Sequence, residues 1–281
     1  MKDRLLLVDG HNLLFQMFYG MPSRITGRSG VDIRGVVGFV GALCRLIRMC
    51  APTHIALIFD SETHNPRCDI LDEYKANRPD FSLMSDDENP FARLPDIYRA
   101  IDEMGIRHEE ARLAECDDVI ASYALSYKDE CEIVISSHDS DFLQLISDSV
   151  RILRYRGDST LICDGEYVMN KFGVSPGLYI DAKALYGDTS DNIPGIRGIG
   201  PKTAAKLVSE AGGAEELIRS PERIQNPRLR KMIEESGDMI RRNLSLMRLS
   251  GDAPLPFTLD ELKWEPRVYR TMDILKNIDL I

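Results

Sequence analysis

Short apolar runs that end close to an aspartate constrain the fold of this chain more than any other feature. Three runs have this form: residues 5–8 are followed by Asp9, residues 54–59 by Asp60, and residues 132–136, after a short interval, by Asp139. Apolar runs of this length are typical of strands that are buried on both faces of a parallel sheet. Because parallel strands need crossover connections, the intervening segments should form helices on both faces. The sequence therefore predicts an α/β fold with a central, mostly parallel sheet.

Helical apolar spacing supports this alternation. It predicts helices over residues 35–50, 94–104, 116–127 and 202–209, one longer helix over 227–249, and further strands near residues 106 and 151–153. Residues 61–95 are polar and carry several prolines, which indicates a loop or a partly ordered insertion. Residues 175–211 are rich in glycine and proline before their helical pattern begins.

Composition limits the class of protein. The 281 residues are 43% hydrophobic, enough for one large domain or for one domain with a small appendage. The six cysteines are scattered and form no C-x-x-C pair, so free thiols in a reducing compartment are expected. The first apolar run is too short for a signal peptide, and no run has the length of a membrane span. We therefore expect a soluble, cytoplasmic protein.

The net charge of −10 argues against a nucleic-acid binder, which usually carries a basic surface. That objection weakens if many carboxylates share one pocket and are neutralised by metal ions. The local positions of the basic residues then matter more than the total charge.

Acidic residues do gather at a few places in the sequence. Asp9, Asp60 and Asp139 should lie together, because sites in open parallel sheets form at the carboxyl ends of the strands. Three further groups join them: Glu115, Asp117 and Asp118 at a predicted helix start, Asp141 beside Asp139, and Asp188 with Asp191. Helix capping explains one or two of the acids at 115–118, and solvated turns explain the other groups individually about as well. Gathered at one sheet edge, however, they would repel one another unless cations were present.

Oxygen ligands without histidine or cysteine select Mg²⁺ or Mn²⁺. Two such ions, roughly 4 Å apart, stabilise the attacking and the leaving oxygen in phosphodiester hydrolysis, and no protein nucleophile is needed. The five histidines show no ligand spacing. His11 and His138 lie near the expected pocket, where ordinary polar roles are favoured over contacts to metal ligands.

Two basic segments could bind a phosphate backbone. Tyr74-Lys75-Ala76-Asn77-Arg78 lies in the polar segment, where a solvated amphipathic helix is the alternative interpretation. Residues 195–204 form a glycine-rich turn that opens a helix, so the backbone and the helix N-terminus could approach a phosphate. Tight turns need glycine in any case, so this loop alone is weak evidence.

The chain resembles the 5′ nuclease family, which includes the N-terminal exonuclease domain of bacterial DNA polymerase I, phage 5′ nucleases and, more distantly, flap endonucleases. The matching strings are LLLVDGHNLLF, THIALIFD, EYKANRPDF, ECDDVIASYA, SSHDSDFLQL and GDTSDNIPGIRGIGPKTAAKLV. They span residues 5 to about 210. The resemblance implies a PIN-like or resolvase-like core with its metal site and a helical arch in residues 1–174 (the arch at about 61–95). A helix–three-turn–helix subdomain with C-terminal helices is implied for residues 175–281.

The resemblance also implies which residues hold the metal ions. They are Asp9, Asp60, Glu115, Asp117, Asp118, Asp139, Asp141, Asp188 and Asp191. It places Asp9, Asp60, Glu115 and Asp117 nearer one ion, and Asp139, Asp141, Asp188 and Asp191 nearer the other. The departures are local and remove no ligand: Cys116 replaces a common alanine, His138 a common glycine and His11 a common serine.

DNA contacts follow from the same resemblance. Lys75 and Arg78 match cationic arch residues that stabilise charge on the scissile phosphate. Further candidate contacts are Tyr74, for which packing is slightly favoured over base stacking, with Arg67, Lys183, Gly198, Gly200, Lys202, Thr203 and Lys206. K⁺ is implied as an additional ion at the helix–three-turn–helix element.

The sequence is thus identified as a standalone, structure-selective, metal-dependent 5′ nuclease, expected as a monomer. Its substrate would be DNA with a 5′ end, a 5′ flap, an overhang or a branch, with the strand of an RNA primer as a further substrate, in replication or repair. The first alternative is a catalytically weak protein of the same fold that binds branched DNA. The second is a metal-dependent phosphatase, which would leave the glycine-rich element unexplained.

Overall fold

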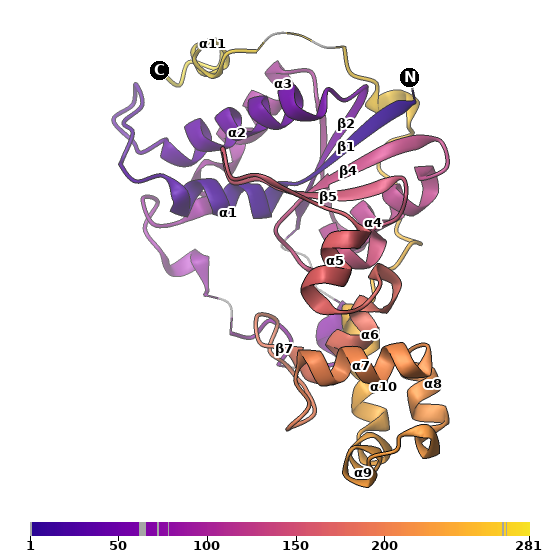
Figure 1. The fold of residues 1–281 in the computed structure, drawn as a ribbon. Coiled ribbons are helices and arrows are strands. Elements are labelled where there is room, and N and C mark those ends of the chain that lie inside the picture. The colour runs from indigo at the N-terminus through magenta and orange to yellow at the C-terminus, as the bar shows by residue number, and fades with distance from the viewer. Residues whose placement is uncertain (1, 62–65, 72, 78, 266, 268) are drawn as a thin grey trace.

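The computed structural model describes residues 2–61, 66–71, 73–77, 79–265, 267 and 269–281. Its centre is a six-stranded sheet in the order β3-β2-β1-β4-β5-β6 (Figure 1). The strands are β1 (Asp3–Asp9), β2 (His54–Asp60), β3 (Arg107–Ala111), β4 (Cys131–Ser136), β5 (Val150–Arg154) and β6 (Leu161–Cys163). The first five pair in parallel and β6 is antiparallel to β5. The prediction of a mostly parallel sheet is confirmed.

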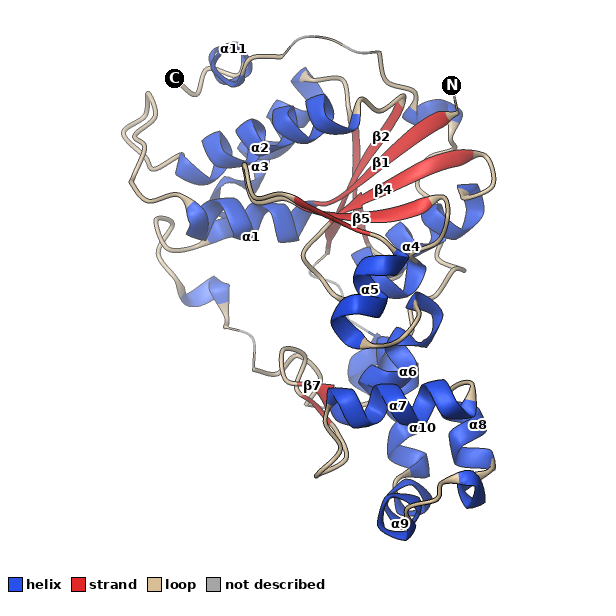
Figure 2. Cartoon of the chain, viewed as in Figure 1, coloured by secondary structure: helices blue, strands red, loops and turns tan. Residues whose placement is uncertain are grey.

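Helices cover both faces of this sheet (Figure 2). The helices α1 (Gly10–Gly20), α2 (Arg34–Cys50) and α3 (Leu94–Glu103) lie on one face, and α4 (Cys116–Tyr127) lies on the other. Within β1, Leu6 and Val8 belong to the core on the face of α1, α2 and α3, whereas Leu5 and Leu7 belong to the core on the face of α4. This alternation, with both faces buried, is why the strand is a continuous apolar run.

A second body of helices follows the sheet. It contains α5 (Gly165–Phe172), α6 (Pro176–Tyr186), α7 (Pro201–Ala211), α8 (Ala214–Arg219), α9 (Pro227–Glu235) and α10 (Gly237–Met247). The helix α6 packs against both α7 and α10, and a small hairpin of β7 (Gly187–Asp188) and β8 (Ile193–Pro194) follows α6. Figure 1 shows these helices extending away from the sheet.

The single helix expected over residues 227–249 is wrong, because the chain breaks between α9 and α10. Ser236 leaves helical geometry, with φ −111° and ψ 7°, and Gly237 follows it. Glycine lowers helix stability, and a Cβ at Gly237 would lie only 3.3 Å from the side chain of Ile218. The break lets α10 turn back along α6.

The segment expected to form the arch differs from a regular helix. Its described residues from 66 to 93 form three 3-10 turns, Pro66–Asp69, Phe81–Leu83 and Pro90–Arg93, and no α-helix. Pro79 and Pro90 lack backbone N–H donors, and each disfavours helical geometry in the residue that precedes it. Phe81 and Phe91 instead pack against Phe15 of α1, each with its ring centre 5.3 Å away.

The C-terminal segment returns to the first body rather than staying with α6–α10. Trp264 and α11 (Thr271–Asn277) join the core formed by α1, α2 and α3, and the backbone N–H of Trp264 donates to the carbonyl of Thr53 (2.9 Å). Residues 175–281, expected as one region, are therefore divided between the two bodies. Among the described residues, no helix has both the length and the apolar character to cross a membrane.

Candidate metal centre

The site lies where the strand order of the sheet changes direction. From β1 the chain proceeds outward to β2 and β3, whereas β4 and β5 lie on the opposite side of β1. This is the crevice in which open α/β sheets place their sites. Asp9 ends β1, Asp60 ends β2, and Asp139 follows β4, so the topology brings these three acids to one edge, as predicted.

Asp9 is buried and held on both carboxylate oxygens. Its Oδ1 accepts from the backbone N–H of Asn12 (3.0 Å), so that Asp9 caps the N-terminus of α1. Its Oδ2 accepts from the hydroxyl of Ser137 (2.8 Å). Burial, followed by the charges of Asp60 and Asp139, raises the pKa of Asp9 to about 7 in spite of these hydrogen bonds. A carboxylate in this position is costly unless a cation faces it.

Asp117 completes this first group from the N-terminus of α4. Burial and the charges of Asp139, Asp9 and Asp60 raise its pKa well above the usual range. Asp60 behaves differently: burial alone would raise its pKa, but the neighbouring His11 and the backbone N–H of Cys116 (3.0 Å) bring the net shift downward. His11 thus touches a candidate ligand, with Nδ1 3.7 Å from Asp60 Oδ2.

A second acidic group lies beside the first. Carboxylate oxygens of Asp141, Asp188 and Asp191 lie within 4.8 Å of one another. The backbone N–H of Asp141 donates to Asp139 Oδ1 (2.8 Å), which connects the two groups. Burial raises the pKa of Asp141 to about 7, although the ammonium of Lys183 acts in the opposite direction.

Lys183 enters this second group from α6. Its ammonium pairs with Asp141 and with Asp188, whose Oδ2 is 2.5 Å away. Burial alone would lower the pKa of Lys183, but the two carboxylates raise it instead. The same ammonium keeps the pKa of Asp188 below its usual value against the effect of burial.

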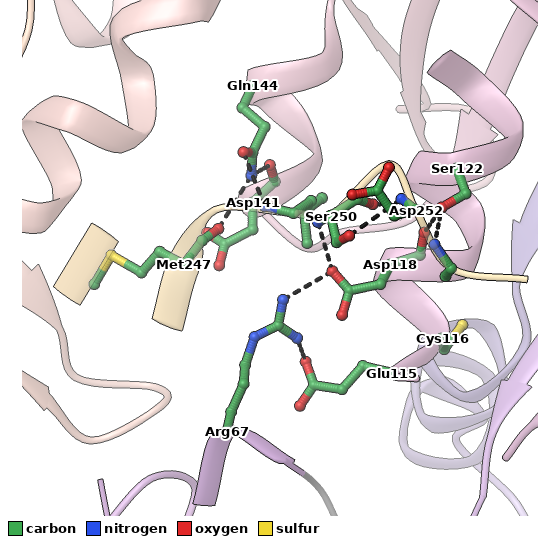
Figure 3. Close-up of polar contacts among 12 residues, drawn as sticks. Arg67, Glu115, Cys116, Asp118, Ser122, Asp141, Gln144, Met247, Ser250 and Asp252 are labelled. Carbon is green, nitrogen blue, oxygen red and sulfur yellow. Dashed lines mark hydrogen bonds and ion pairs between the residues drawn. The ribbon is translucent and has the colours of Figure 1, made fainter. Parts of the chain in front are cut away.

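Glu115 and Asp118 both face Arg67, which lies in the segment that precedes Lys75 (Figure 3). The guanidinium of Arg67 pairs with Glu115 through Nη1 and with Asp118 Oδ1 through Nη2, the latter at 2.8 Å. Glu115 Oε1 also accepts from the ammonium of Lys75 (2.9 Å). Asp118 Oδ1 further accepts from the backbone N–H of Ser250 (2.8 Å).

The segment 73–77 is fastened to the loop of the β7–β8 hairpin. The backbone N–H of Lys75 donates to the carbonyl of Asp191 (3.1 Å), and the Asn192 side chain donates to the carbonyl of Glu73 (2.9 Å). Lys75 and Asn192 have φ of 56° and 59°, a left-handed geometry that is uncommon for such residues. Strained backbone is therefore kept beside the acidic groups, as functional sites often show.

This donor set fits divalent cations. Carboxylates with raised pKa, supplied by three separate segments as Asp9, Asp117 and Asp141, provide oxygen ligands and a strongly negative potential. Such ligands suit Mg²⁺ or Mn²⁺ better than softer metals. The residues predicted as ligands are all in this region, and basic side chains of the 66–77 segment engage Glu115 and Asp118.

The predicted DNA contacts divide into buried and exposed residues. Arg67 and Lys183 are buried and hold groups of the acidic site, so their positions differ from the predicted surface contact. Tyr74 is also buried, which agrees with the packing favoured for it, and its hydroxyl faces Glu115. Gly198, Gly200, Lys202 and Lys206 are exposed around the N-terminal half of α7, and Thr203 is half-buried there. Lys75 is partly buried against Glu115. Arg78 lies outside the described residues.

Several residues around the site were not identified from the sequence. Ser137 and Gln144 lie next to predicted ligands in the chain, so a search of the neighbouring polar residues could have found them. Asn243 and Ser250 carry no such signal, because their contacts depend on the packing of α10 against α6 and on the return of the chain after α10. Asn243 is fully buried and donates to the carbonyls of Ala184 (2.9 Å) and Pro194 (2.8 Å).

Comparisons with known proteins agree with this arrangement. The 5′-3′ exonuclease family matches in two parts, its N-terminal resolvase-like domain over residues 4–173 and its C-terminal SAM fold over residues 174–269. DNA polymerase I of Rhizobium leguminosarum is 36% identical over 94% of the chain, and that of Mycobacterium tuberculosis is 36% identical over 98%. The chain spans only 26% and 31% of these relatives.

Solved structures show the same fold. The T5 5′-exonuclease with bound zinc ions superposes with a TM-score of 0.72 at 22% identity, and 98% of this chain and 99% of that chain are covered. The catalytic core of Rad2 in complex with a DNA substrate gives a TM-score of 0.58 at 15% identity, with coverages of 99% and 86%. With both parts of the family description matched in order, the chain belongs to the 5′-3′ exonuclease family.

Proposed function

We propose that this protein is a structure-selective, metal-dependent 5′ nuclease that hydrolyses DNA phosphodiester bonds at 5′ ends and 5′ flaps. The observation that carries the proposal is the convergence of buried carboxylates at the strand-order change, where Asp9, Asp117 and Asp141 all have raised pKa values. This environment favours the binding of divalent cations.

Mg²⁺ or Mn²⁺ would be held by two neighbouring sets of acids. Asp9, Asp60, Glu115 and Asp117 would lie nearer one ion, and Asp139, Asp141, Asp188 and Asp191 nearer the other. When bound, such cations supply charge stabilisation on phosphate oxygens and lower the pKa of water. The residues of the chain then have defined tasks. Asn12 and Ser137 orient Asp9, Cys116 orients Asp60, and Lys75 brings a positive charge to the edge of the acidic site.

DNA would be gripped by the helical body. The helix α7 begins after Gly200 without a side-chain cap, so backbone N–H groups of its first turn are available to a phosphate. Exposed Lys202 and Lys206 add positive charge on the same helix. Such contacts read no base sequence, which agrees with selection by structure. The DNA in the Rad2 complex supports this partner, and we further propose K⁺ binding at the turn around Gly198.

A cleavage assay tests the proposal. A labelled duplex with a 5′ DNA flap, and the same duplex with an RNA flap, is incubated with the protein in Mg²⁺, in Mn²⁺ or in chelator. We expect cutting near the junction in either metal and none in chelator, and Asp117→Asn should abolish cutting while flap binding remains. Binding without cutting in both metals would instead identify a branched-DNA-binding protein. Hydrolysis of small phosphate monoesters without regard to DNA structure would point to a phosphatase.

A further inference from the structure

Asp118 has surroundings that differ from those of Asp9, Asp117 and Asp139. It is 8% exposed, and its Oδ1 accepts both from Arg67 Nη2 and from the backbone N–H of Ser250, each at 2.8 Å. Asp9, Asp117 and Asp139 instead face one another, so that their charges repel. The negative charge of Asp118 is therefore already matched by a buried guanidinium.

Arg67 connects this acid to Glu115. It is 8% exposed, and its two terminal nitrogens reach one carboxylate each, Nη1 to Glu115 and Nη2 to Asp118 (Figure 3). Glu115 Oε1 accepts in turn from Lys75 (2.9 Å). The position of Lys75 at the acidic site thus depends on the same carboxylate that Arg67 holds.

The return segment after α10 fastens onto α4 at the same place. Besides the bond from Ser250 to Asp118, the backbone N–H of Ala253 donates to the hydroxyl of Ser122 (2.9 Å), which itself donates to the carbonyl of Asp118 (2.8 Å). Gln144 donates to the carbonyls of Asp141 (2.7 Å) and Met247 (3.2 Å). Figure 3 shows Gln144 between Asp141 and Met247, and Ser250 beside Asp118.

We propose that Arg67 and Asp118 form a positioning pair rather than a phosphate contact and a metal ligand. The pair joins three parts of the molecule: the 66–77 segment that carries Lys75, the N-terminus of α4 that carries Glu115 and Asp117, and the return segment from the DNA-gripping helices. The inference rests on the proposed function, because it assigns roles within that site. A guanidinium beside Asp118 opposes a dication at the same oxygen, since like charges repel strongly where solvent is excluded.

The experiment compares Asp118→Asn, Arg67→Gln, their double variant and Asp117→Asn. Asparagine keeps an oxygen acceptor for the N–H of Ser250 and removes only the charge that faces Arg67. Asp181→Asn is the matched control, because Asp181 is also 8% exposed, accepts one backbone N–H from Ala214 (2.8 Å) and faces one arginine, Arg248 (3.6 Å), away from the acidic groups. The readouts are Mn²⁺ binding by calorimetry, and kcat and KM on the 5′-flap duplex.

We expect Asp118→Asn and Arg67→Gln to lower kcat roughly 10- to 100-fold, as misplacement of about 1 Å does, with KM nearly unchanged. The double variant should be no slower than the slower single variant, because partners in one unit are not additive. Mn²⁺ stoichiometry and affinity should be retained in both single variants and reduced in Asp117→Asn. Arg67→Lys should not rescue kcat, because lysine cannot bridge two carboxylates with a planar fork.

Three results would overturn the assignment. Loss of Mn²⁺ binding in Asp118→Asn equal to that in Asp117→Asn would make Asp118 a ligand. If the kcat losses of the two single variants multiply in the double variant, the two residues act independently of each other. An equal fall of kcat in Asp181→Asn would mean that the loss reflects general stability. If the unaltered protein does not cut, the proposed function fails, and the Mn²⁺ titrations still decide whether Asp118 is a ligand.

Discussion

The carboxylates of the site should destabilise the protein when no cation is bound, and Asp117→Asn should therefore stabilise it. Asn has nearly the same shape as Asp and removes one of the charges that repel Asp9, Asp60 and Asp139. The pKa of Asp9, raised from 3.8 to about 7, gives the scale. A shift of about three pKa units corresponds to about 4 kcal/mol between protonation states. Burial is the largest cause of that shift, and the charges of Asp60 and Asp139 add to it. Asp117→Asn relieves only charge repulsion, so we expect a gain of no more than about 2 kcal/mol at pH 8, or roughly 4–8 °C in Tm for a chain of this size.

The sign of the pH dependence follows from the raised pKa values. Between pH 3.8 and about 7 the folded protein holds protons on Asp9 and Asp141 that the unfolded chain has released, so stability falls as pH rises through this window. The gain from Asp117→Asn should therefore be largest at pH 8 and should shrink at pH 5.5, where protonation already relieves the repulsion in the unaltered protein.

Thermal unfolding in chelator at the two pH values measures this difference. Asp129→Asn, at an exposed position in the turn after α4, is the control for removal of one negative charge. Saturating Mg²⁺ should reverse the order of stability, because an ion that binds only the folded state stabilises it in proportion to its affinity. The reasoning would be refuted by an Asp117→Asn protein that is less stable than the unaltered protein in chelator at pH 8, or by a difference that is the same at both pH values.

Three further predictions concern single elements. Gly195→Ala should unfold the β7–β8 hairpin and cost at least about 3 kcal/mol in urea denaturation, because the new Cβ would lie 2.1 Å from the backbone of Tyr186. Gly177→Ala, where no atom lies within 4 Å, should be neutral or more stable by up to about 1 kcal/mol, and equal losses at both glycines would contradict the packing argument. Lys75→Ala should lower kcat on a flap substrate more than it weakens flap binding measured by anisotropy; equal losses in both would remove its proposed role at the phosphate. Lys202→Ala combined with Lys206→Ala should weaken duplex binding and reduce the slope of log affinity against log salt by about 2, whereas an unchanged slope would place the DNA elsewhere.

Features that depend on neighbouring residues in the chain could be predicted from the sequence. The strands at 5–8 and 54–59 are apolar because both faces are buried, and the acids at their ends meet because parallel strands share one carboxyl edge. The remaining acids stand out as groups in the sequence and the resemblance implies that they are ligands, and the structure brings Asp141, Asp188 and Asp191 within 4.8 Å of one another. Their division between two ions stays a prediction.

What the sequence could not predict depends on contacts between distant segments. Lys183 looks like a surface lysine in the chain, but α6 places its ammonium between Asp141 and Asp188. Arg67 looks like a phosphate contact, but the approach of its segment to α4 buries it between two carboxylates. The break at Ser236 likewise has a weak local signal, because the turn is completed by packing of Gly237 against Ile218.

The path of the chain after α10 makes this protein hard to divide. The border between the two matched family regions falls at residues 173 and 174, yet Trp264 and Ile274 complete the core beneath α2 and α3. A fragment that ends at residue 174 would leave that core open to water, and a fragment that starts there would carry apolar residues with no partner surface. The two regions are thus recognisable as separate units in sequence but form one interdependent unit in folding. Excision or transplantation of either half should give an aggregating product rather than a working module.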